Sequence, residues 1–504
     1  MAVNQLKVGV ILNYIIIVLN GLVGIIYTPF LLRMLGQSEY GLYSLAASVI
    51  AYLSILDLGF GNAVIRYTAK YRAEGKVEEQ HALFGMFTMI YSVLGFIVVL
   101  CGIYLTTQID TMFASSMTAT ELARMRPIMM LMTFNLAVTF PLSIYGAIIT
   151  AYEQFIFLRV VQIVRIILNM CIMICLLTLG YKALALVVVQ TIFNVITLLL
   201  NYFYAKKKIH IKLTFKKIDF ALFREIVIYS FWIFLNVIMD RVYWSTGQFV
   251  LGITYGTVAV AVFAVAIQLE NIYMTFSTAI SGVFLPKITT MVSTGKSNQE
   301  ISNVFVSTGR IQYLILSLIL SGFIIFGQSF INLWAGAGYE DAYIITLLFM
   351  SALIVPLIQN IGISILQARN QMKFRSLLYV AIATVCLIVQ FPMAKLYGGI
   401  GCAITIASSL ALGQGIIMNI YYHRVQKIDI LRFWKEILRM SIVPILMTIA
   451  FYHVAATYVI DSILELILGI VVYLLLYLPL LYMFSMNNHE KDMLTNMVKH
   501  ISKR

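Results

Sequence analysis

Five charged side chains stand inside long apolar stretches of this sequence, where a charge is costly. They are Asp57, Arg165, Asp240, Arg241 and Glu270. An ionisable group at the centre of a membrane helix costs roughly 2.5–3.5 kcal/mol or more, so it normally faces a cavity or a charged partner. A guanidinium in such a place can bind an anionic group, and a desolvated carboxylate can take up a proton. The five charges therefore predict a polar site within the apolar part of the chain.

Arg241 is the deepest of the basic residues. It lies about 16 residues from the start of its apolar run, or roughly 25 Å along a helix, too deep for its side chain to reach the surface easily. We expect it to contact an anionic substrate or to form a salt bridge between helices. Asp240 lies about 100° away around the same helix, so the two do not share a face. Asn236 precedes Asp240 by four residues and adds a polar group to that face.

Arg165 lies six residues past Arg159, roughly 9 Å along a helix. Its side chain could extend back to the membrane surface, or it could be the first contact of an incoming anionic group. Asn169 follows it by four residues, on the same face. Asn13 and Asn20 lie seven residues apart on another predicted helix. These asparagines are candidate contacts for a polar substrate, and hydrogen bonds between helices are the alternative.

Two carboxylates are candidates for ion coupling or gating. Glu270 lies deep in an apolar run, where it can pair with Arg241 or take up a proton during a transport cycle. Asp57 stands beside Gly59 and Gly61, near the end of another run. We expect Asp57 to fix a close helix contact, or a gate, by pairing with a basic neighbour.

The composition places the whole chain in a membrane. Of its 504 residues, 61% are hydrophobic and 11% are charged, whereas soluble domains carry about 25% charged residues. Apolar runs of roughly 20 residues, enough to cross the hydrocarbon core, recur along the chain. They lack the alternation of barrel strands, so they must be helices. The first run is too long for a signal-peptide core and has no small-residue cleavage site, so we expect a retained helix.

These patterns predict an all-α integral membrane protein with about fourteen transmembrane helices. We expect the helices near 8–32, 41–64, 82–107, 127–150, 157–180, 183–205, 222–252, 257–285, 307–334, 341–367, 376–395, 398–422, 437–459 and 461–486.

Positive charge is distributed very unequally between the two sides of this arrangement. Of the 35 Lys and Arg residues, 28 fall on the side of the N-terminus, five on the other side and two within helices. Short cytoplasmic loops retain positive charge, so both termini are predicted to be cytoplasmic. The net charge of +14 is accordingly a topology signal, and no nucleic acid partner is expected.

A faint internal repeat suggests how the helices are grouped. At an offset of 220 residues, Gly36 matches Gly256 and Asn20 matches Asp240. The predicted plan is two pseudo-symmetric six-helix bundles followed by a helix pair. Its parts are 1–205, a basic cytoplasmic linker at 206–221, 222–422, helices 13 and 14 at 437–486, and a cytoplasmic tail at 487–504.

Two short motifs resemble those of a known family. They are DLGFGNA at 57–63 leading into RY at 66–67, and YGT at 255–257. With fourteen helices and about 500 residues, the chain resembles the polysaccharide-transport (Wzx-type) flippases of the multidrug/oligosaccharidyl-lipid/polysaccharide exporter superfamily. The resemblance implies two bundles with a central cavity in a bacterial cytoplasmic membrane. The implied substrate is an undecaprenyl-pyrophosphate-linked oligosaccharide, moved from the cytoplasmic to the outer leaflet.

The same resemblance implies roles for the candidate residues. Cations would hold the diphosphate, polar and aromatic groups the sugars, and an apolar groove the polyprenyl chain. Helices 13 and 14 would occupy the place of the helix pair that accommodates the lipid tail in related lipid II flippases. Coupling to protons or sodium, and contact with other polysaccharide-assembly proteins, are further expectations. A cation-coupled multidrug antiporter and a lipid II flippase are the alternatives within the superfamily.

Enzymatic function finds little support in the sequence. A membrane polymerase or ligase would be expected to carry a sizeable outer loop with acid, base or arginine clusters, but the longest outer loop runs only from about 106 to 126. The histidines have no metal-ligand spacing, and the five cysteines lie within apolar runs. The GKS at 295–297 lacks the upstream glycine of a phosphate-binding loop. We therefore expect no catalytic residue, metal or cofactor.

Overall fold

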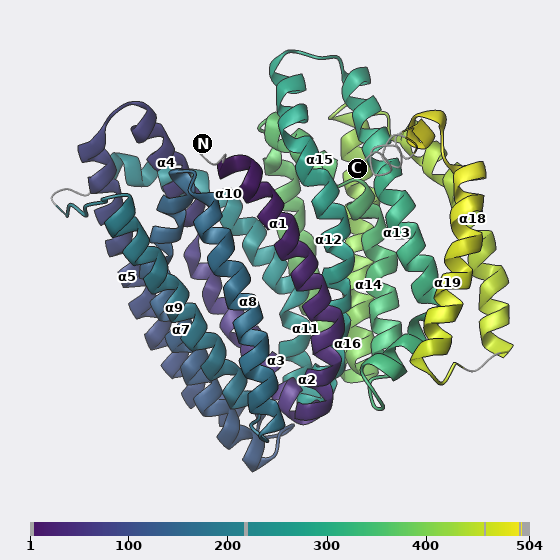
Figure 1. Ribbon diagram of the computed structural model, residues 1–504, viewed down its shortest axis with the longest axis horizontal. Coiled ribbons are helices and arrows are strands. Elements are labelled where there is room, and N and C mark those ends of the chain that lie inside the picture. The colour runs from purple at the N-terminus through teal and green to yellow at the C-terminus, as the bar shows by residue number, and fades with distance from the viewer. Residues whose placement is uncertain (1–4, 216–219, 458–459, 493–494, 496–504) are drawn as a thin grey trace. The chain divides into compact units, whose positions relative to one another are not determined.

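The computed structural model describes residues 5–215, 220–457, 460–492 and 495. Its regular structure is entirely helical over these residues, which confirms the all-α fold class. Figure 1 shows the long helices along the chain. They form two compact units, Met1–Ala264 and Val265–Arg504. The predicted grouping into two six-helix bundles and a helix pair stays a prediction.

The first unit consists of eleven helices with two short segments of different winding. They are α1 (Gln5–Leu22), the π-helix η1 (Val23–Tyr27), α2 (Thr28–Leu35), α3 (Gln37–Leu53), the 3-10 helix η2 (Ser54–Asp57), α4 (Phe60–Ala73), α5 (Val77–Thr107), α6 (Ile109–Phe113), α7 (Ala119–Ala151), α8 (Phe155–Thr178), α9 (Ala183–Lys208), α10 (Phe220–Trp244) and α11 (Thr246–Thr254). The first residues of α12 also belong to this unit.

The second unit holds the rest of α12 and the helices that follow it. They are α12 (Thr257–Ser293), α13 (Asn298–Trp334), α14 (Asp341–Ile358), α15 (Ile361–Ala368), α16 (Met372–Leu410), the π-helix η3 (Ala411–Ile417), α17 (Met418–Arg424), α18 (Ile430–Thr457), α19 (Ile463–Leu480) and the π-helix η4 (Leu481–Ser485).

Twelve helical segments of the described chain are long and apolar enough to cross a membrane. One of them, Met372–Arg424, has 53 residues and covers two predicted helices, because Gly398 leaves the helical conformation with φ 57° and ψ −136°. The predicted helix at 222–252 corresponds to α10 and α11. Each of the fourteen predicted helices thus has a counterpart in the structure.

For the predicted helices at 127–150 and 307–334, the helix in the structure begins earlier, in the polar sequence that precedes the apolar run. The structure starts α7 at Ala119 and α13 at Asn298, each after a capping box. In the second box the Ser297 hydroxyl accepts from the N–H of Glu300, and the Glu300 carboxylate accepts from the N–H of Ser297. Such reciprocal bonds satisfy the first free donors of a helix, so polar residues can extend it outside the membrane.

The predicted helix at 41–64 lies within one candidate membrane span, Gln37–Ala73, but the helix is not continuous, because the chain breaks between α3 and α4. Leu58 and Gly59 adopt left-handed conformations, with φ 52° and 71°. Glycine tolerates this region, whereas leucine rarely enters it. Asp57, immediately before the break, accepts a 2.9 Å hydrogen bond from the Tyr91 hydroxyl. Its partner is a tyrosine of α5 and not the basic side chain that we expected.

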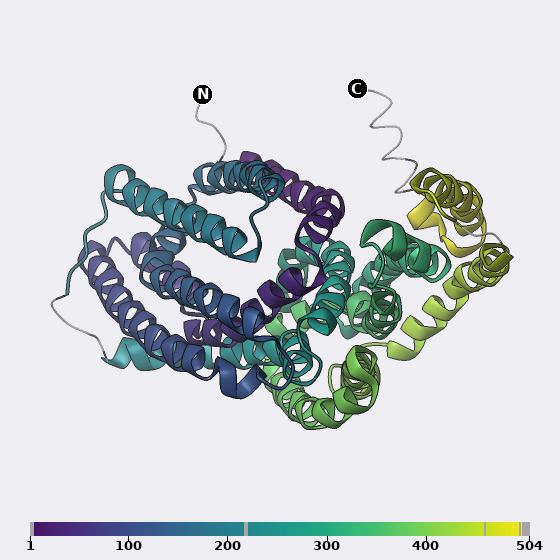
Figure 2. The ribbon, with the colours of Figure 1, turned by 90° about the horizontal axis from the view of Figure 1, so that it is seen from below.

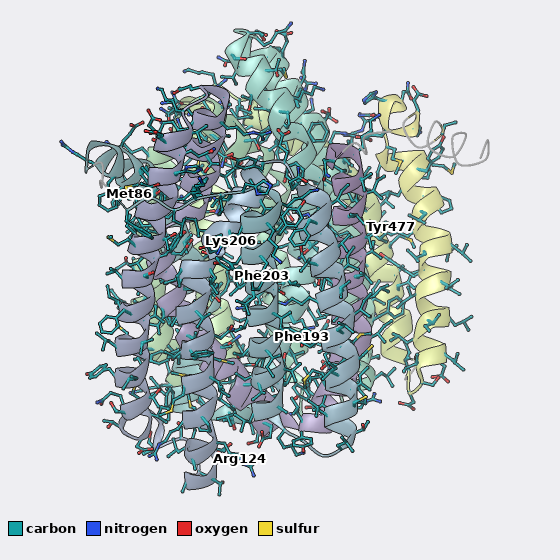
Figure 3. The ribbon with its side chains drawn as sticks, turned by 60° about the vertical axis from the view of Figure 1, so that its left-hand side comes forward. Met86, Arg124, Phe193, Phe203, Lys206 and Tyr477 are labelled. Carbon is teal, nitrogen blue, oxygen red and sulfur yellow. The ribbon has the colours of Figure 1, made fainter. Side chains whose placement is uncertain are left out.

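The first unit has two ends, named here after residues that Figure 3 labels. Arg124, near the start of α7, lies at one end, and Lys206, near the end of α9, lies towards the other. We call them the Arg124 end and the Lys206 end. The charge distribution predicts that the Arg124 end faces outside and the Lys206 end faces the cytoplasm.

Several helix N-termini meet around two carboxylates at the Arg124 end. The Glu121 carboxylate accepts hydrogen bonds of 2.6 Å from Ser38 at the start of α3 and from Thr257 at the start of α12. Glu39 accepts from the first N–H of α9, at 3.2 Å, and pairs with Arg124. Negative groups are stabilised at helix N-termini by the free N–H groups and the helix dipole. The two glutamates therefore fasten this end of the first unit.

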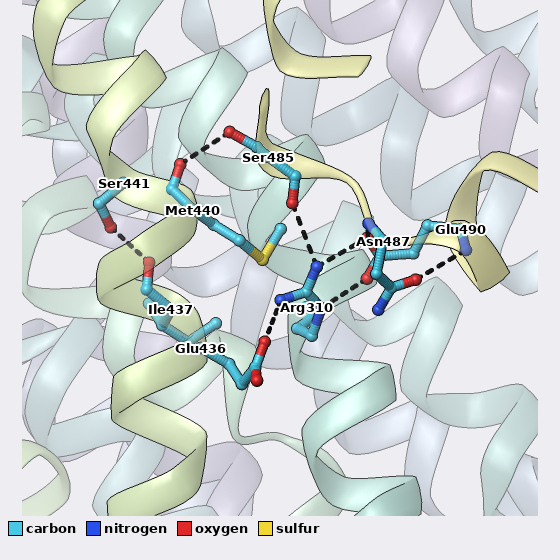
Figure 4. A network of polar contacts seen from close by, with 8 residues as sticks. All are labelled: Arg310, Glu436, Ile437, Met440, Ser441, Ser485, Asn487 and Glu490. Carbon is cyan, nitrogen blue, oxygen red and sulfur yellow. Dashed lines mark hydrogen bonds and ion pairs between the residues drawn. The ribbon is translucent and has the colours of Figure 1, made fainter. Parts of the chain in front are cut away.

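Arg310 fastens α18 and the residues after η4 to α13 in the second unit. It makes a two-point ion pair with Glu490 at 2.6 and 2.9 Å and a third ionic bond of 2.6 Å with Glu436 (Figure 4). The side chains of Arg310 and Glu490 are 4% and 5% exposed. Apolar packing continues this attachment along α13, α18 and α19, which lie side by side in Figures 1 and 2.

Replacing Arg310 with Met tests this attachment. Breaking a buried ion pair leaves the partner carboxylate uncompensated, so we expect R310M to lower stability by roughly 3–5 kcal/mol. Thermal unfolding of the purified protein in detergent would measure the loss. R126Q is the matched control, because Arg126 pairs with Asp110 on the exposed surface, where an ion pair contributes about 0–1 kcal/mol. If R310M unfolded at the wild-type temperature, the proposed attachment would be wrong.

Candidate functional site

A cavity of about 650 Å³ lies within the first unit. Its lining comes from five helices and the short segment η2. The lining residues are Asn20 of α1; Tyr43, Ala47, Ile50 and Ala51 of α3; Ser54 of η2; Met132, Asn135, Leu136 and Thr139 of α7; Gln162, Arg165, Ile166 and Asn169 of α8; and Gln190 and Asn194 of α9.

Helical spacing explains why polar side chains converge on this space. Asn135 precedes Thr139, Arg165 precedes Asn169 and Gln190 precedes Asn194, in each case by four residues. Residues four apart share one face of a helix. Helices α7, α8 and α9 are in mutual contact, so the three polar faces can meet (Figure 1).

Hydrogen bonds join the three faces into one network around Asn194. Its Nδ2 donates to Asn135 Oδ1 and to Thr139 Oγ1 of α7, both at 2.7 Å. Its Oδ1 accepts from Arg165 Nη1 of α8 at 3.4 Å. The amide of α9 thus connects the cation of α8 to the polar groups of α7.

Among the described residues that line the cavity, Arg165 is the single charged one, and none is a carboxylate. Among the described residues, its guanidinium makes one hydrogen bond, the long one to Asn194. An arginine has five N–H donors, so most of its bonding capacity is unused. The cavity therefore combines a positive charge with free donors and can accept an anion.

The rest of the lining is both polar and apolar. Tyr43 of α3 and Gln190 of α9 form a pair, with 3.0 Å between Gln190 Nε2 and the tyrosine oxygen. Alanine, isoleucine, leucine and methionine side chains lie between the polar groups. A surface of this kind suits ligands that present hydroxyl groups beside C–H surface.

Comparison with known proteins places the chain in a family. The model of the family described as polysaccharide biosynthesis protein matches residues 6–292, more than half of the chain. The chain belongs to this family. No curated protein sequence matches the chain significantly.

Solved structures show the fold to which this family member belongs. A multidrug resistance MATE family transporter of the MOP superfamily, in an inward-facing conformation, aligns with TM-score 0.63 and 14% identity, covering 80% of this chain and 94% of its own. A MOP superfamily transporter from Pyrococcus furiosus aligns with TM-score 0.57 and 14% identity, covering 84% and 95%. The MATE multidrug transporter DinF-BH gives TM-score 0.57 and 14% identity, covering 84% and 96%.

These likenesses show that the chain has the fold of the MOP superfamily transporters, which agrees with the predicted fold. By its family model the chain is a member of the polysaccharide biosynthesis family, and its described part has twelve helical segments that are long and apolar enough to cross a membrane.

The cavity brings together three of the nine predicted site residues. Arg165, Asn169 and Asn20 all line it. Asn13 lies on α1 seven residues before Asn20, is half-buried and is not part of the lining. Asp57 follows η2 residue Ser54, which lines the cavity, but is itself bonded to Tyr91.

The other predicted residues lie away from this cavity. Asn236, Asp240 and Arg241 are on α10 and do not belong to the lining; Asp240 is exposed, and the other two are half-buried. Glu270 is in the second unit, on α12, and is 1% exposed. Substrate contact by Arg241, Asn13 and Asn236, and ion coupling by Asp57, Asp240 and Glu270, stay predictions.

The polar residues of α7 and α9 were not among the predicted site residues. Asn135, Thr139, Gln190 and Asn194 are uncharged, and amides in membrane helices commonly serve helix contacts. A usable signal was present, because each helix carries two polar residues four apart within an apolar run. The sequence does not show which of these polar faces meet one another, because that depends on how the helices pack in the structure.

Thiol labelling tests whether the cavity is accessible to water. In a variant whose five native cysteines are replaced by alanine, we expect Ser54→Cys, which lines the cavity, to react with a hydrophilic maleimide. Thr133→Cys is the matched control, because Thr133 is buried against Gly102. The mass shift on labelling measures the reaction. Equal protection of the two cysteines would contradict the assignment of a wet cavity.

Proposed function

We propose that this membrane protein flips a polyprenyl-pyrophosphate-linked oligosaccharide from the cytoplasmic to the outer leaflet, and that Arg165 holds the diphosphate in the cavity of the first unit. The proposal places it in the bacterial cytoplasmic membrane with both termini in the cytoplasm. The observation that carries the proposal is the cavity's charge: one arginine with unused donors and no carboxylate.

An arginine in this position needs an anionic partner. Within a membrane an uncompensated guanidinium is expensive, and no acidic residue of the lining offsets Arg165. The planar guanidinium matches phosphate oxygens with two parallel bonds, and such charge-assisted bonds are roughly twice as strong as neutral ones. A diphosphate on the substrate would supply the compensation that the protein itself does not.

The remaining parts of the substrate also find suitable surfaces. The Tyr43–Gln190 pair and its apolar neighbours offer hydrogen bonds and C–H contact to sugar rings. In the second unit, an apolar groove of about 200 Å³ lies among α13, α14 and α18. Ser317 and Ser321 line it, but each shares a hydrogen bond with a tyrosine of α19. The groove is therefore suited to a short stretch of the polyprenyl chain.

Family membership supports the glycan as cargo, and the cavity's chemistry opposes the rival transporter class. The matched family is described as a polysaccharide biosynthesis protein. An antiporter for cationic drugs would place carboxylates around its substrate, whereas this cavity carries a cation and amides. A lipid II flippase would require the same diphosphate site, so only the headgroup separates it from our proposal.

Deletion and complementation test the proposed function. Cells without the gene should accumulate a polyprenyl-pyrophosphate oligosaccharide on the cytoplasmic side and lose surface glycan, as measured by lipid extraction and mass spectrometry. The wild-type gene should restore export, whereas R165A should reduce it roughly 10- to 100-fold, the loss expected from a charge-assisted bond. R126A, at an exposed ion pair, is the control and should export normally.

Two outcomes would overturn the function. One is unchanged surface glycan with increased drug sensitivity in the deletion strain, which would favour an antiporter. The other is accumulation of the peptidoglycan precursor alone, which would favour lipid II as the substrate. Normal export by R165A, with the protein present in the membrane, would remove Arg165 from the site.

A further inference from the structure

The α8 wall of the cavity is formed by Gln162, Arg165 and Asn169, together with Ile166. The three polar residues are three and four positions apart, so they lie on one face of the helix. An arginine can only donate hydrogen bonds, whereas an amide has a donating and an accepting end. The direction in which each amide points therefore decides what this wall offers to a ligand.

Arg159 determines the orientation of Gln162. Its Nη1 lies 3.2 Å from Gln162 Oε1, and only the amide oxygen can accept from a guanidinium. The other end of the amide, Nε2, makes no hydrogen bond with any described residue. The accepting end of Gln162 is consequently occupied, and its donating end is free for a ligand.

The orientation of the Asn194 amide is likewise fixed by its partners, Thr139 on one side and Arg165 on the other. The Thr139 hydroxyl donates its proton to the Asn135 carbonyl oxygen at 2.7 Å, so towards Asn194 it can only accept. Asn194 Nδ2 must therefore be the atom that faces Thr139, and Asn194 Oδ1 must be the atom that faces Arg165. The polar groups of α7 thus turn Asn194 Oδ1 of α9 towards the guanidinium, which holds the guanidinium at this wall.

Asn169 completes the wall one turn beyond Arg165. Its Oδ1 is shielded from solvent and has no hydrogen-bond partner, and its Nδ2 makes no hydrogen bond with a described residue. Because no described residue fixes the Asn169 amide, a bound ligand decides which end it presents, and a phosphate oxygen would select Nδ2. The wall can therefore offer a phosphate N–H donors from a guanidinium and two amides. Phosphate oxygens only accept, whereas sugar hydroxyls both donate and accept, so a wall of donors favours phosphate.

We propose that Gln162 and Asn169 are specificity-determining donors for the phosphate groups beside Arg165, and that Asn194 is a positioning residue that aims the guanidinium. This inference rests on the proposed function, because it assigns the diphosphate of the substrate to the α8 wall. It also separates two surfaces of the cavity: a donor surface on α8 and a mixed surface at Tyr43 and Gln190 for sugars.

Exchange of amide for acid tests the two donors with almost no change in shape. The purified full-length protein would be titrated with inorganic pyrophosphate, and affinity would be measured by calorimetry. Because Q162E and N169D replace a donor by a negative acceptor, each should weaken binding at least roughly tenfold. Q367E is the matched control: Gln367 is exposed on α15 and is not part of the cavity lining, so binding should not change.

Variants of Asn194 test the positioning role. N194L removes the acceptor that faces Arg165, and N194D adds a carboxylate that neutralises it. Each variant also loses the two Nδ2 bonds to α7, so its melting temperature should fall, and binding is measured well below that temperature. There both variants should weaken pyrophosphate binding, with N194D the weaker binder. A merely structural role predicts instead that the folded fraction of each variant binds with wild-type affinity.

The outcomes separate this inference from the proposed function. If R165A abolishes pyrophosphate binding but Q162E and N169D bind like the wild type, the donor wall is wrong and the function stands. If pyrophosphate binding depends on all three residues while deletion leaves glycan export intact, the donor wall stands and the function is wrong. Binding that responds equally to Q162E and Q367E would also overturn the assignment of the phosphate to α8.

Discussion

Lipid tails cannot solvate the guanidinium of a membrane-spanning helix, and the arrangement of the cavity follows from that constraint. Arg165 must be solvated by protein groups, by water or by a ligand, because its desolvation costs several kcal/mol. Among the described residues, the guanidinium donates one long hydrogen bond, to Asn194 Oδ1, and no carboxylate lines the cavity. A carboxylate would have neutralised the arginine and closed the site to anions. The amide network instead holds the cation in place and leaves its charge available.

The surrounding helices must keep this network aligned. Asn135, Asn194 and Arg165 come from α7, α9 and α8, so their hydrogen bonds depend on the relative positions of three helices. Two features at the Arg124 end secure two of these helices near their starts: Glu121 lies at the beginning of α7, and Glu39 binds the first N–H of α9. Polar bonds at one end of the first unit therefore support the polar bonds in its cavity.

Much of the fold follows from hydropathy, because water exclusion constrains membrane helices more strongly than any local preference. All fourteen predicted helices have counterparts. The predicted boundaries and continuity are wrong where local hydrogen bonds or backbone conformation, and not hydropathy, determine where a helix begins or breaks. Capping boxes extend α7 and α13 into polar sequence, and left-handed residues at Leu58 and Gly59 break a continuous apolar run. The glycines at 59 and 61 were visible in the sequence, but glycine in a membrane helix more often marks close packing than a break.

The site was only partly predictable. Arg165, Asn169 and Asn20 stand out as polar residues in apolar runs, and the structure brings them to one cavity. Arg241 stands out equally, yet it lies outside this lining, because depth along a helix does not determine which way a side chain faces. The neutral residues Asn135, Gln190 and Asn194 carry no such signal. Their importance arises from contacts between helices, which depend on the rotation of each helix about its axis.

Reconstituted flipping tests most directly whether one uncompensated arginine recognises a diphosphate. Purified protein in proteoliposomes would be given two fluorescent polyprenyl glycolipids with the same sugars, one joined through pyrophosphate and one through a neutral linkage, and appearance in the opposite leaflet would be followed by quenching. If Arg165 recognises the diphosphate, wild-type protein should move the pyrophosphate lipid much faster than the neutral one, and R165A should lose this preference. Equal rates for the two lipids with wild-type protein, or an intact preference in R165A, would contradict it.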